Sequence, residues 1–192
     1  MKLKLIVFLI TVACVLGACS NGREQAPVEQ PAGGGRQVTE EMHEAISDYI
    51  VRKYGSVYEQ AEKLFEVHKV YGASESDGII SVYMHSYFGG FNRATGLENQ
   101  AGHSLPAVIR LKKEETGYVV TGYTEPMDGN QYTDSLKNMF PEPFLEQALK
   151  GGGSGEELRK EMEDRVKRWL EESEQLSVLN GAPNDEAGAP EQ

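Results

Sequence analysis

The stretch that decides the fold is LFEVHKVYGASESDGIISVYMHSYF, residues 64–88. Its two flanking runs, 64–71 and 79–88, are rich in the β-branched and aromatic residues that favour strands. Between them, the polar segment Ser74–Gly78 ends in glycine, which suits a tight connection. The pattern therefore predicts a hairpin of two antiparallel strands.

The pairing of these strands determines what each face of the hairpin carries. If they pair about the Ser74–Gly78 connection, even-numbered residues of the first strand share a face with odd-numbered residues of the second. One face is then apolar and is the expected core, with Phe65, Val67, Ile80, Val82, Met84 and Phe88. The opposite face is polar and aromatic, with Glu66, His68, Tyr83, His85 and Tyr87.

A second pair of strands is predicted over 105–112 and 118–124. In the first of these, apolar and polar residues alternate as in a half-buried strand. Pro106 lacks a backbone N–H, so we expect it at a sheet edge or at a strand start. Residues 89–104, which join the two hairpins, are glycine-rich and polar and indicate a long loop.

Helical patterns lie on both sides of the strands. Thr39 can cap a helix that runs to about Tyr54, and short helical segments follow around 135–140 and 143–150. The order of elements predicts an α+β fold, in which an N-terminal helix packs on an antiparallel sheet of about four strands with C-terminal helices. This domain spans residues 39–150.

The glycine-rich linker 151–155 precedes an amphipathic helix, residues 156–179. Its apolar stripe must be buried, either on its own domain or on an envelope protein partner. The candidate partner-binding residues are therefore Leu158, Met162, Val166 and Trp169. Beyond this helix, the acidic tail 180–192 is rich in proline and glycine and predicts disorder.

The N-terminus carries two lysines, then an apolar run over 5–15 that is short for a lasting membrane span. It ends in Leu16-Gly17-Ala18-Cys19, which resembles the lipobox of bacterial lipoproteins. This resemblance implies that residues 1–18 are a signal peptide and that Cys19 carries acyl chains such as palmitate. It also implies an anchor on the extracytoplasmic face of the cell membrane, with 19–38 as a disordered tether.

Charge excludes one class of partner. The formal net charge is −11, and removal of the two signal lysines makes it −13 for the mature chain. Phosphate backbones are repelled by such a surface, so we expect no nucleic-acid partner. The only cysteine outside the signal is the lipidated one, so no disulfide and no cysteine nucleophile is expected.

The chain has four histidines, whose surroundings in the sequence suggest different kinds of chemistry. His43-Glu44 begins a zincin-type motif, but Ser47 stands where the second histidine is needed, and we expect His43 on the helix surface. His68 and His85, on one predicted sheet face, are candidate ligand-binding residues for a small molecule or a metal, although the pair lacks a third metal ligand. A solvated polar face is the alternative interpretation.

His103 is a further candidate ligand-binding residue. Together with Ser104 and the distant Asp128 it suggests a hydrolytic triad, but no nucleophile-elbow motif surrounds the serine. We therefore predict no catalytic residues, no metal site and no cofactor, and an envelope hydrolase remains only an alternative. The glycines of 89–96 also lack the spacings of phosphate-binding loops.

Part of the chain between residues 67 and 141, including the runs 82–88, 102–109 and 123–129, resembles an uncharacterised extracytoplasmic domain of Gram-positive-type bacteria. Similar stretches occur beyond the membrane segments of antirepressor-type metallopeptidases, whose peptidase motif is missing here. The resemblance implies a sensory or interaction domain. We therefore expect a lipid-anchored, non-enzymatic binding or regulatory module, with a small-ligand or metal receptor on the His68/His85 face as the alternative.

Overall fold

The structure is a computed structural model that describes residues 36–58, 60–151 and 155–180. The expected signal peptide, Cys19, most of the tether and nearly all of the acidic tail lie outside these residues. The fold is α+β, as predicted, with a four-stranded antiparallel sheet in the order β1-β2-β3-β4. The elements are α1 (Glu40–Gly55), β1 (Lys63–Ser76), β2 (Ile79–Phe91), β3 (Ala101–Glu114), β4 (Gly117–Thr124), η1 (Gly129–Gln131), α2 (Tyr132–Met139), α3 (Glu142–Leu149) and α4 (Gly155–Asn180).

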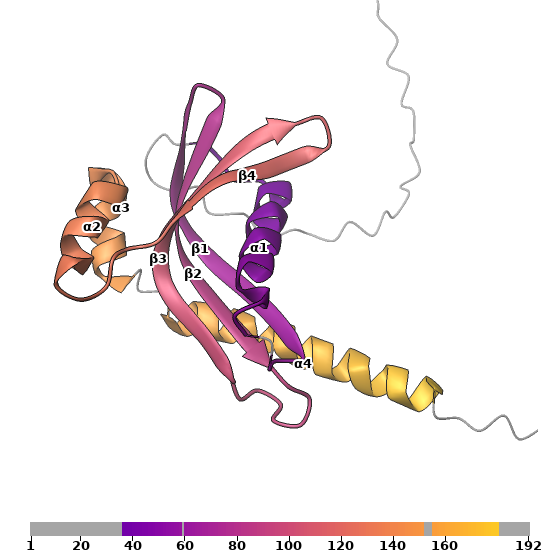
Figure 1. The fold of residues 1–192 in the computed structure, drawn as a ribbon. Helices are drawn as coiled ribbons and strands as arrows, with labels where there is room; N and C mark the ends of the chain where they lie inside the picture. The colour runs from indigo at the N-terminus through magenta and orange to yellow at the C-terminus, as the bar shows by residue number, and fades with distance from the viewer. Residues whose placement is uncertain (1–35, 59, 152–154, 181–192) are drawn as a thin grey trace, which may run out of the picture.

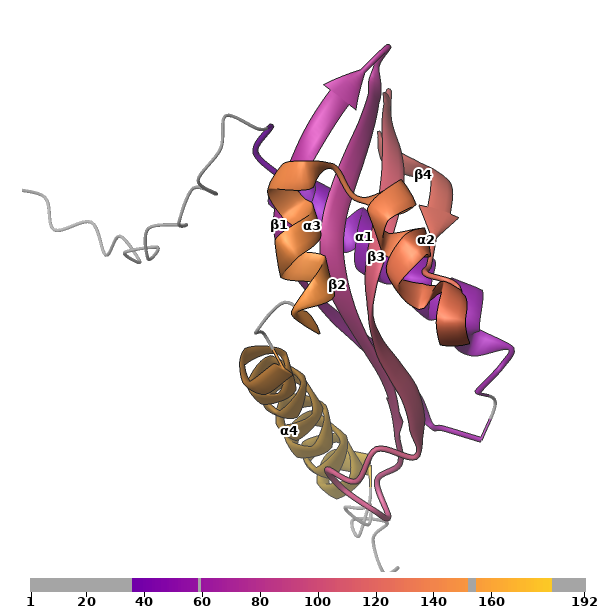
Figure 2. The ribbon, with the colours of Figure 1, turned by 90° about the vertical axis from the view of Figure 1, so that its left-hand side faces the viewer.

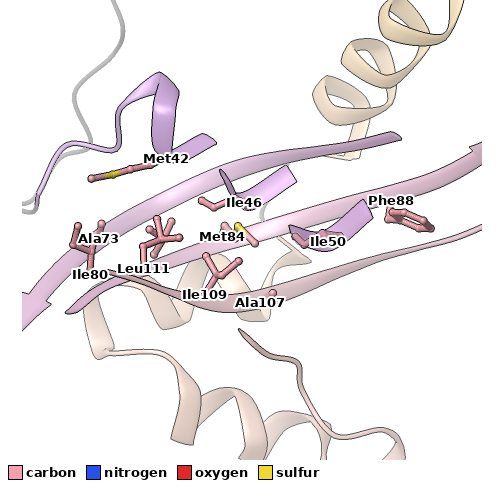
Figure 3. Close-up of a cluster of buried hydrophobic side chains, with 11 residues drawn as sticks. Met42, Ile46, Ile50, Ala73, Ile80, Met84, Phe88, Ala107, Ile109 and Leu111 are labelled. Carbon is pink, nitrogen blue, oxygen red and sulfur yellow. The ribbon is translucent and has the colours of Figure 1, made fainter. Parts of the chain in front are cut away.

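The sheet is covered by helices on both faces. In Figure 1, α1 lies on one face, while α2, α3 and α4 lie on the other, as Figure 2 shows from the side of α2 and α3. The core under α1 is built from its buried residues Met42, Ile46 and Ile50, which recur at helical spacing and meet the strands (Figure 3). From the sheet, this core receives Ala73, Ile80, Val82, Met84, Phe88, Ala107, Ile109 and Leu111.

The hairpin turn is confirmed, but the predicted faces are only partly right. Asp77 and Gly78 have φ values of 53° and 74°, which a two-residue primed turn requires, and Ser76 pairs with Ile79. Near this turn, even-numbered residues oppose odd-numbered ones, as expected. A register shift between Val70 and Gly72 then adds one residue to β1, so that further along the strand even residues oppose even residues.

This bulge corrects the predicted core. Beyond it, Glu66 and His68 turn toward α1, whereas Phe65 and Val67 face α4. The prediction that His68 and His85 share a face is therefore wrong, because a shift of one residue moves every following side chain to the other face.

The C-terminal helix docks on its own domain. Leu158, Met162 and Val166 are buried beside Val67 and Phe91, and the ring of Trp169 lies edge-on to that of Phe65 with centroids 6.0 Å apart. The apolar stripe is therefore buried on its own domain, the first of the two alternatives, while Trp169 stays partly exposed.

The smaller helices pack on the same face through Tyr71, Tyr83 and Val108. Gly72 allows this approach, because a Cβ at that position overlaps the ring of Phe144 of α3.

The strands are longer than predicted, and the loop between β2 and β3 shrinks from 89–104 to 92–100. Gly89, Gly90 and Gly102 lie within paired strands, where Gly89 opposes Gly102, and only Gly96 stays in the loop. A Cβ on Gly102 overlaps the carbonyl oxygen of Phe88, so the close approach of β2 and β3 requires glycine here. Pro106 lies on the part of β3 that β4 does not reach, which confirms its edge position.

The domain also begins earlier than predicted. The backbone N–H of Arg36 donates to the carbonyl of Ala73 at 3.1 Å, and its guanidinium pairs with Glu75. Val38 packs on the core beneath α1. The last three residues of the predicted tether therefore belong to the folded domain. Within the part of the chain that is described, no helix is long and apolar enough to cross a membrane.

Candidate functional site

A buried carboxylate lies where α1 crosses β1. Glu66 is only 1% exposed and accepts hydrogen bonds from three side chains. The hydroxyls of Ser47 on α1 and Ser86 on β2 each donate at 2.7 Å, and His68 Nδ1 lies 2.9 Å from Oε2. A buried charge is tolerated only when it is paired and hydrogen-bonded, and both conditions are met here.

His68 carries this network on to α1. Its Nε2 atom lies 2.7 Å from Nδ1 of His43, and the two rings stack with centroids 4.9 Å apart. We name Glu66, His68 and His43 the histidine relay. The half-buried position of His43 corrects the prediction that it is a surface residue.

The carboxylate fixes the direction of the hydrogen bonds in the relay. Glu66 can only accept, so Nδ1 of His68 carries the hydrogen of that bond. When both imidazoles are neutral, Nε2 of His68 must then accept from Nδ1–H of His43. His43 is left with an unprotonated Nε2, and the relay therefore ends in a basic lone pair.

The relay borders a cleft of about 590 Å³ beside the outer edge of β1, between α1 and α4. Its lining is Glu40, His43, Glu44, Ser47, Asp48, His68, Glu161 and Arg165. Arg165 donates to the main-chain carbonyl of Glu66 at 3.3 Å and pairs with Glu161 at 2.9 Å. With neutral histidines, the cleft carries four carboxylates against one guanidinium and is strongly negative.

The electrostatics of the relay follow from its burial. Burial by itself raises the pKa of Glu66, but attraction to His68 and hydrogen bonds from His68, Ser86 and Ser47 outweigh it and lower the pKa. Burial lowers the pKa of His43, and a positive charge on His68 lowers it further. The relay therefore holds an ionised carboxylate and favours a neutral imidazole at the cleft.

His85 lies in a separate network on the opposite face of the sheet. Its Nδ1 is 3.3 Å from the Tyr71 hydroxyl, and its Nε2 is 2.8 Å from Oγ of Ser104. Burial lowers the pKa of His85. His68 and His85 therefore lie on opposite faces of the sheet and cannot form the predicted shared receptor face.

His103 does not complete the suggested triad, since Ser104 is hydrogen-bonded to His85 instead. The His103 ring stacks on Phe88 and lies edge-on to Tyr54, whose hydroxyl donates to Glu125. Its Nε2 atom is buried without a hydrogen-bond partner, and burial lowers its pKa. His103 thus belongs to the aromatic packing at the end of α1.

The sequence pattern missed the residues that make this site. The predicted strand pairing puts Glu66 on a polar face. Ser47 and Arg165 are polar at positions where exposure is expected, and Ser86 is a small polar residue that gives no signal on the predicted core face. Among the residues that the structure covers, no group of three or more His, Cys, Asp or Glu side chains is arranged to hold a metal ion.

The chain matches no protein-family model, and no curated protein and no solved structure is significantly similar to it.

Proposed function

We propose that this protein is a lipid-anchored binding module on the extracytoplasmic face of the cell membrane, held there through Cys19. Its ligand site is the cleft between α1 and α4, and its ligand is a small molecule that carries an amino group. The observation that supports this proposal is the histidine relay, which links a buried carboxylate to a basic nitrogen at the cleft.

The free-energy penalty of burying the Glu66 carboxylate argues that the relay has a binding role. An apolar side chain at the position of Glu66 fills the same space without the penalty of burying a charge. Perturbed titratable groups beside a cleft are typical of functional sites. The relay also ends at solvent rather than inside the core, and its last atom is a hydrogen-bond acceptor.

The chemistry of the cleft selects the ligand. An ammonium or amino group donates hydrogen bonds, and Nε2 of His43 accepts them. Glu40, Glu44 and Asp48 follow one another at four-residue spacing along the exposed side of α1, so they present negative charge together. An anionic ligand is repelled by the same groups.

The binding experiment is titration calorimetry of the folded domain with 1,4-diaminobutane, and with succinate as a probe of similar length and opposite charge. We expect saturable binding of the diamine alone. Glu44→Gln with Asp48→Asn weakens it at least about tenfold, because each lost charge contact is worth about 1 kcal/mol or more. The control is Glu114→Gln with Glu115→Gln at the β3–β4 turn, which removes the same charge elsewhere. Equal affinities of the two double variants contradict the proposed site.

The anchor is tested separately in cells that make the full chain. A palmitate analogue should label the wild-type protein, and Cys19→Ser should abolish the label and release the protein from membranes. Membrane retention of the unlabelled Cys19→Ser protein contradicts this part of the proposal and leaves the cleft untouched.

A further inference from the structure

The second histidine network ends at solvent on a different part of the molecule. Ser104 is exposed and lies on β3, while His85 is 7% exposed on the neighbouring strand β2. β4 ends opposite Val108, so β3 residues 101–107 have a strand on one side only. Figure 2 shows this part of the sheet between the α2–α3 pair and α4.

The position of His85 is fixed by its surroundings. It follows Tyr83, which packs against α2 and α3, and precedes Tyr87, which packs against α4. Its ring spans from the buried Tyr71 hydroxyl, 3.3 Å from Nδ1, to Oγ of Ser104, 2.8 Å from Nε2. A base held by a third group and touching a hydroxyl is the arrangement that activates a serine.

One proton arrangement makes Ser104 a nucleophile. Nδ1 of His85 then donates to Tyr71, and Nε2 accepts the hydrogen of Ser104. The Tyr71 phenol stays protonated, because burial and the nearby Tyr132 raise its pKa. Since burial also disfavours the imidazolium, His85 is neutral in neutral solution and keeps a lone pair for the serine.

We propose that Ser104 is a reactive serine that accepts the acyl group of a carboxylic ester, with His85 as its general base and Tyr71 as a positioning residue. The Ser104 hydroxyl gives its proton to Nε2 of His85 as Oγ bonds to the carbonyl carbon. The bond to the alcohol oxygen then breaks, and the departing alkoxide takes the proton from His85. Acyl-Ser104 and a free alcohol result. His85 then removes a proton from a water molecule as the water attacks the acyl carbon, which releases a carboxylic acid and restores Ser104.

The free edge of β3 supplies the approach for such a substrate. Backbone N–H groups on the unpaired side of an edge strand point outward, and they can donate to an extended acyl chain and to the developing oxyanion. Pro106 lacks a backbone N–H and therefore marks the end of the available donors. The substrate class is therefore an ester with an extended acyl portion.

The test is labelling of the full chain with a fluorophosphonate probe, followed by mass spectrometry of the peptides. We expect one adduct, on Ser104, which Ser104→Ala abolishes. Ser76→Ala is the control, because Ser76 is also exposed but hydrogen-bonds to Asp77 rather than to a histidine. His85→Gln should slow labelling at least about a hundredfold, the usual scale of a lost general base. An adduct on other serines, or no adduct on the folded wild type, overturns the proposal.

The pH profile provides a readout that does not depend on a variant folding. If His85 is the base, the labelling rate of the wild type falls in acid as the imidazole takes up a proton, and Tyr71→Phe changes this profile. The opposite outcome is a labelling rate that rises only with hydroxide concentration and is the same in the wild type and in His85→Gln. Ser104 is then an ordinary hydroxyl that His85 does not activate. Because this serine lies outside the cleft, neither result affects the proposed amine site.

Discussion

The two faces of the sheet each carry a histidine network, and they differ in what anchors it. On the α1 face, the anchor is the carboxylate of Glu66, which can only accept hydrogen bonds and therefore, while both imidazoles are neutral, sets the direction of every bond up to His43. On the other face, the anchor is the phenol of Tyr71, which can donate or accept. A charged anchor gives a fixed polarity and costs more to bury, whereas a phenol costs less and leaves the direction open.

The largest expected effect is on the charged anchor. Glu66→Gln keeps the shape but turns an amide nitrogen toward groups that all donate, so we expect a loss of about 3–5 kcal/mol in the free energy of unfolding. Tyr71→Phe removes one long hydrogen bond from His85 and should cost about 1 kcal/mol. Urea unfolding measures both variants. Equal losses contradict the distinction between the two anchors.

The next effect concerns the helix that covers the second face. Leu158→Ala truncates a side chain that is 2% exposed, and the expected loss is about 2–5 kcal/mol. Leu176→Ala is the matched control on the same helix, where the side chain is 59% exposed and the expected change is within about 0.5 kcal/mol. Thermal unfolding compares the two, and similar melting temperatures mean that α4 does not dock on its own domain.

A glycine on β1 determines how closely α3 approaches. Gly72→Ala places a methyl group against the Phe144 ring, and the expected loss is about 1–3 kcal/mol. In a Phe144→Ala background, the same change should cost much less, because the ring that it meets is gone. A double-mutant cycle by urea unfolding measures this coupling, and additive losses argue against the contact.

Acid should destabilise both networks through their histidines. Burial lowers the pKa of His43 and of His85 below the ordinary value of 6.5, so below this pH the unfolded chain binds more protons than the folded one. The free energy of unfolding therefore falls as the pH drops from 6.5 through each folded pKa, and His103 adds to this trend. Unfolding at about pH 7.5 and about pH 5.5 avoids most carboxyl titration. His43→Gln and His85→Gln should each reduce the change in the free energy of unfolding between these two pH values. If either variant leaves that change unaltered, the acid sensitivity comes from the other titratable groups.

The smallest effect is expected at the surface ion pair that joins β1 to α4. Lys69 and Glu157 lie 2.6 Å apart, but their side chains are 40% and 66% exposed. Lys69→Ala should change the free energy of unfolding by less than about 1 kcal/mol, and added salt should reduce the difference further. A larger loss means that this pair, rather than the apolar stripe, holds α4 in place.

Local patterns in the sequence were sufficient to predict the α+β class, the four strands and the amphipathic helices. Strand-forming runs, the Asp77-Gly78 turn and the 3.6-residue spacing of apolar residues each depend on neighbours close in the chain. The strand ends were not predictable in the same way, because Gly89 and Gly102 are typical of loops when read alone. Their place in paired strands depends on the close approach of β2 and β3.

The candidate sites were decided by tertiary structure. An alternating pattern gives the period of a strand but does not show where one extra residue enters it, and the bulge at Tyr71 reversed the faces of Glu66 and His68. The sequence by itself determined which residues were available for chemistry. Only the packing of α1 and α4 around β1 determined which of them meet, because contacts between distant segments depend on register and on the space that neighbouring side chains leave.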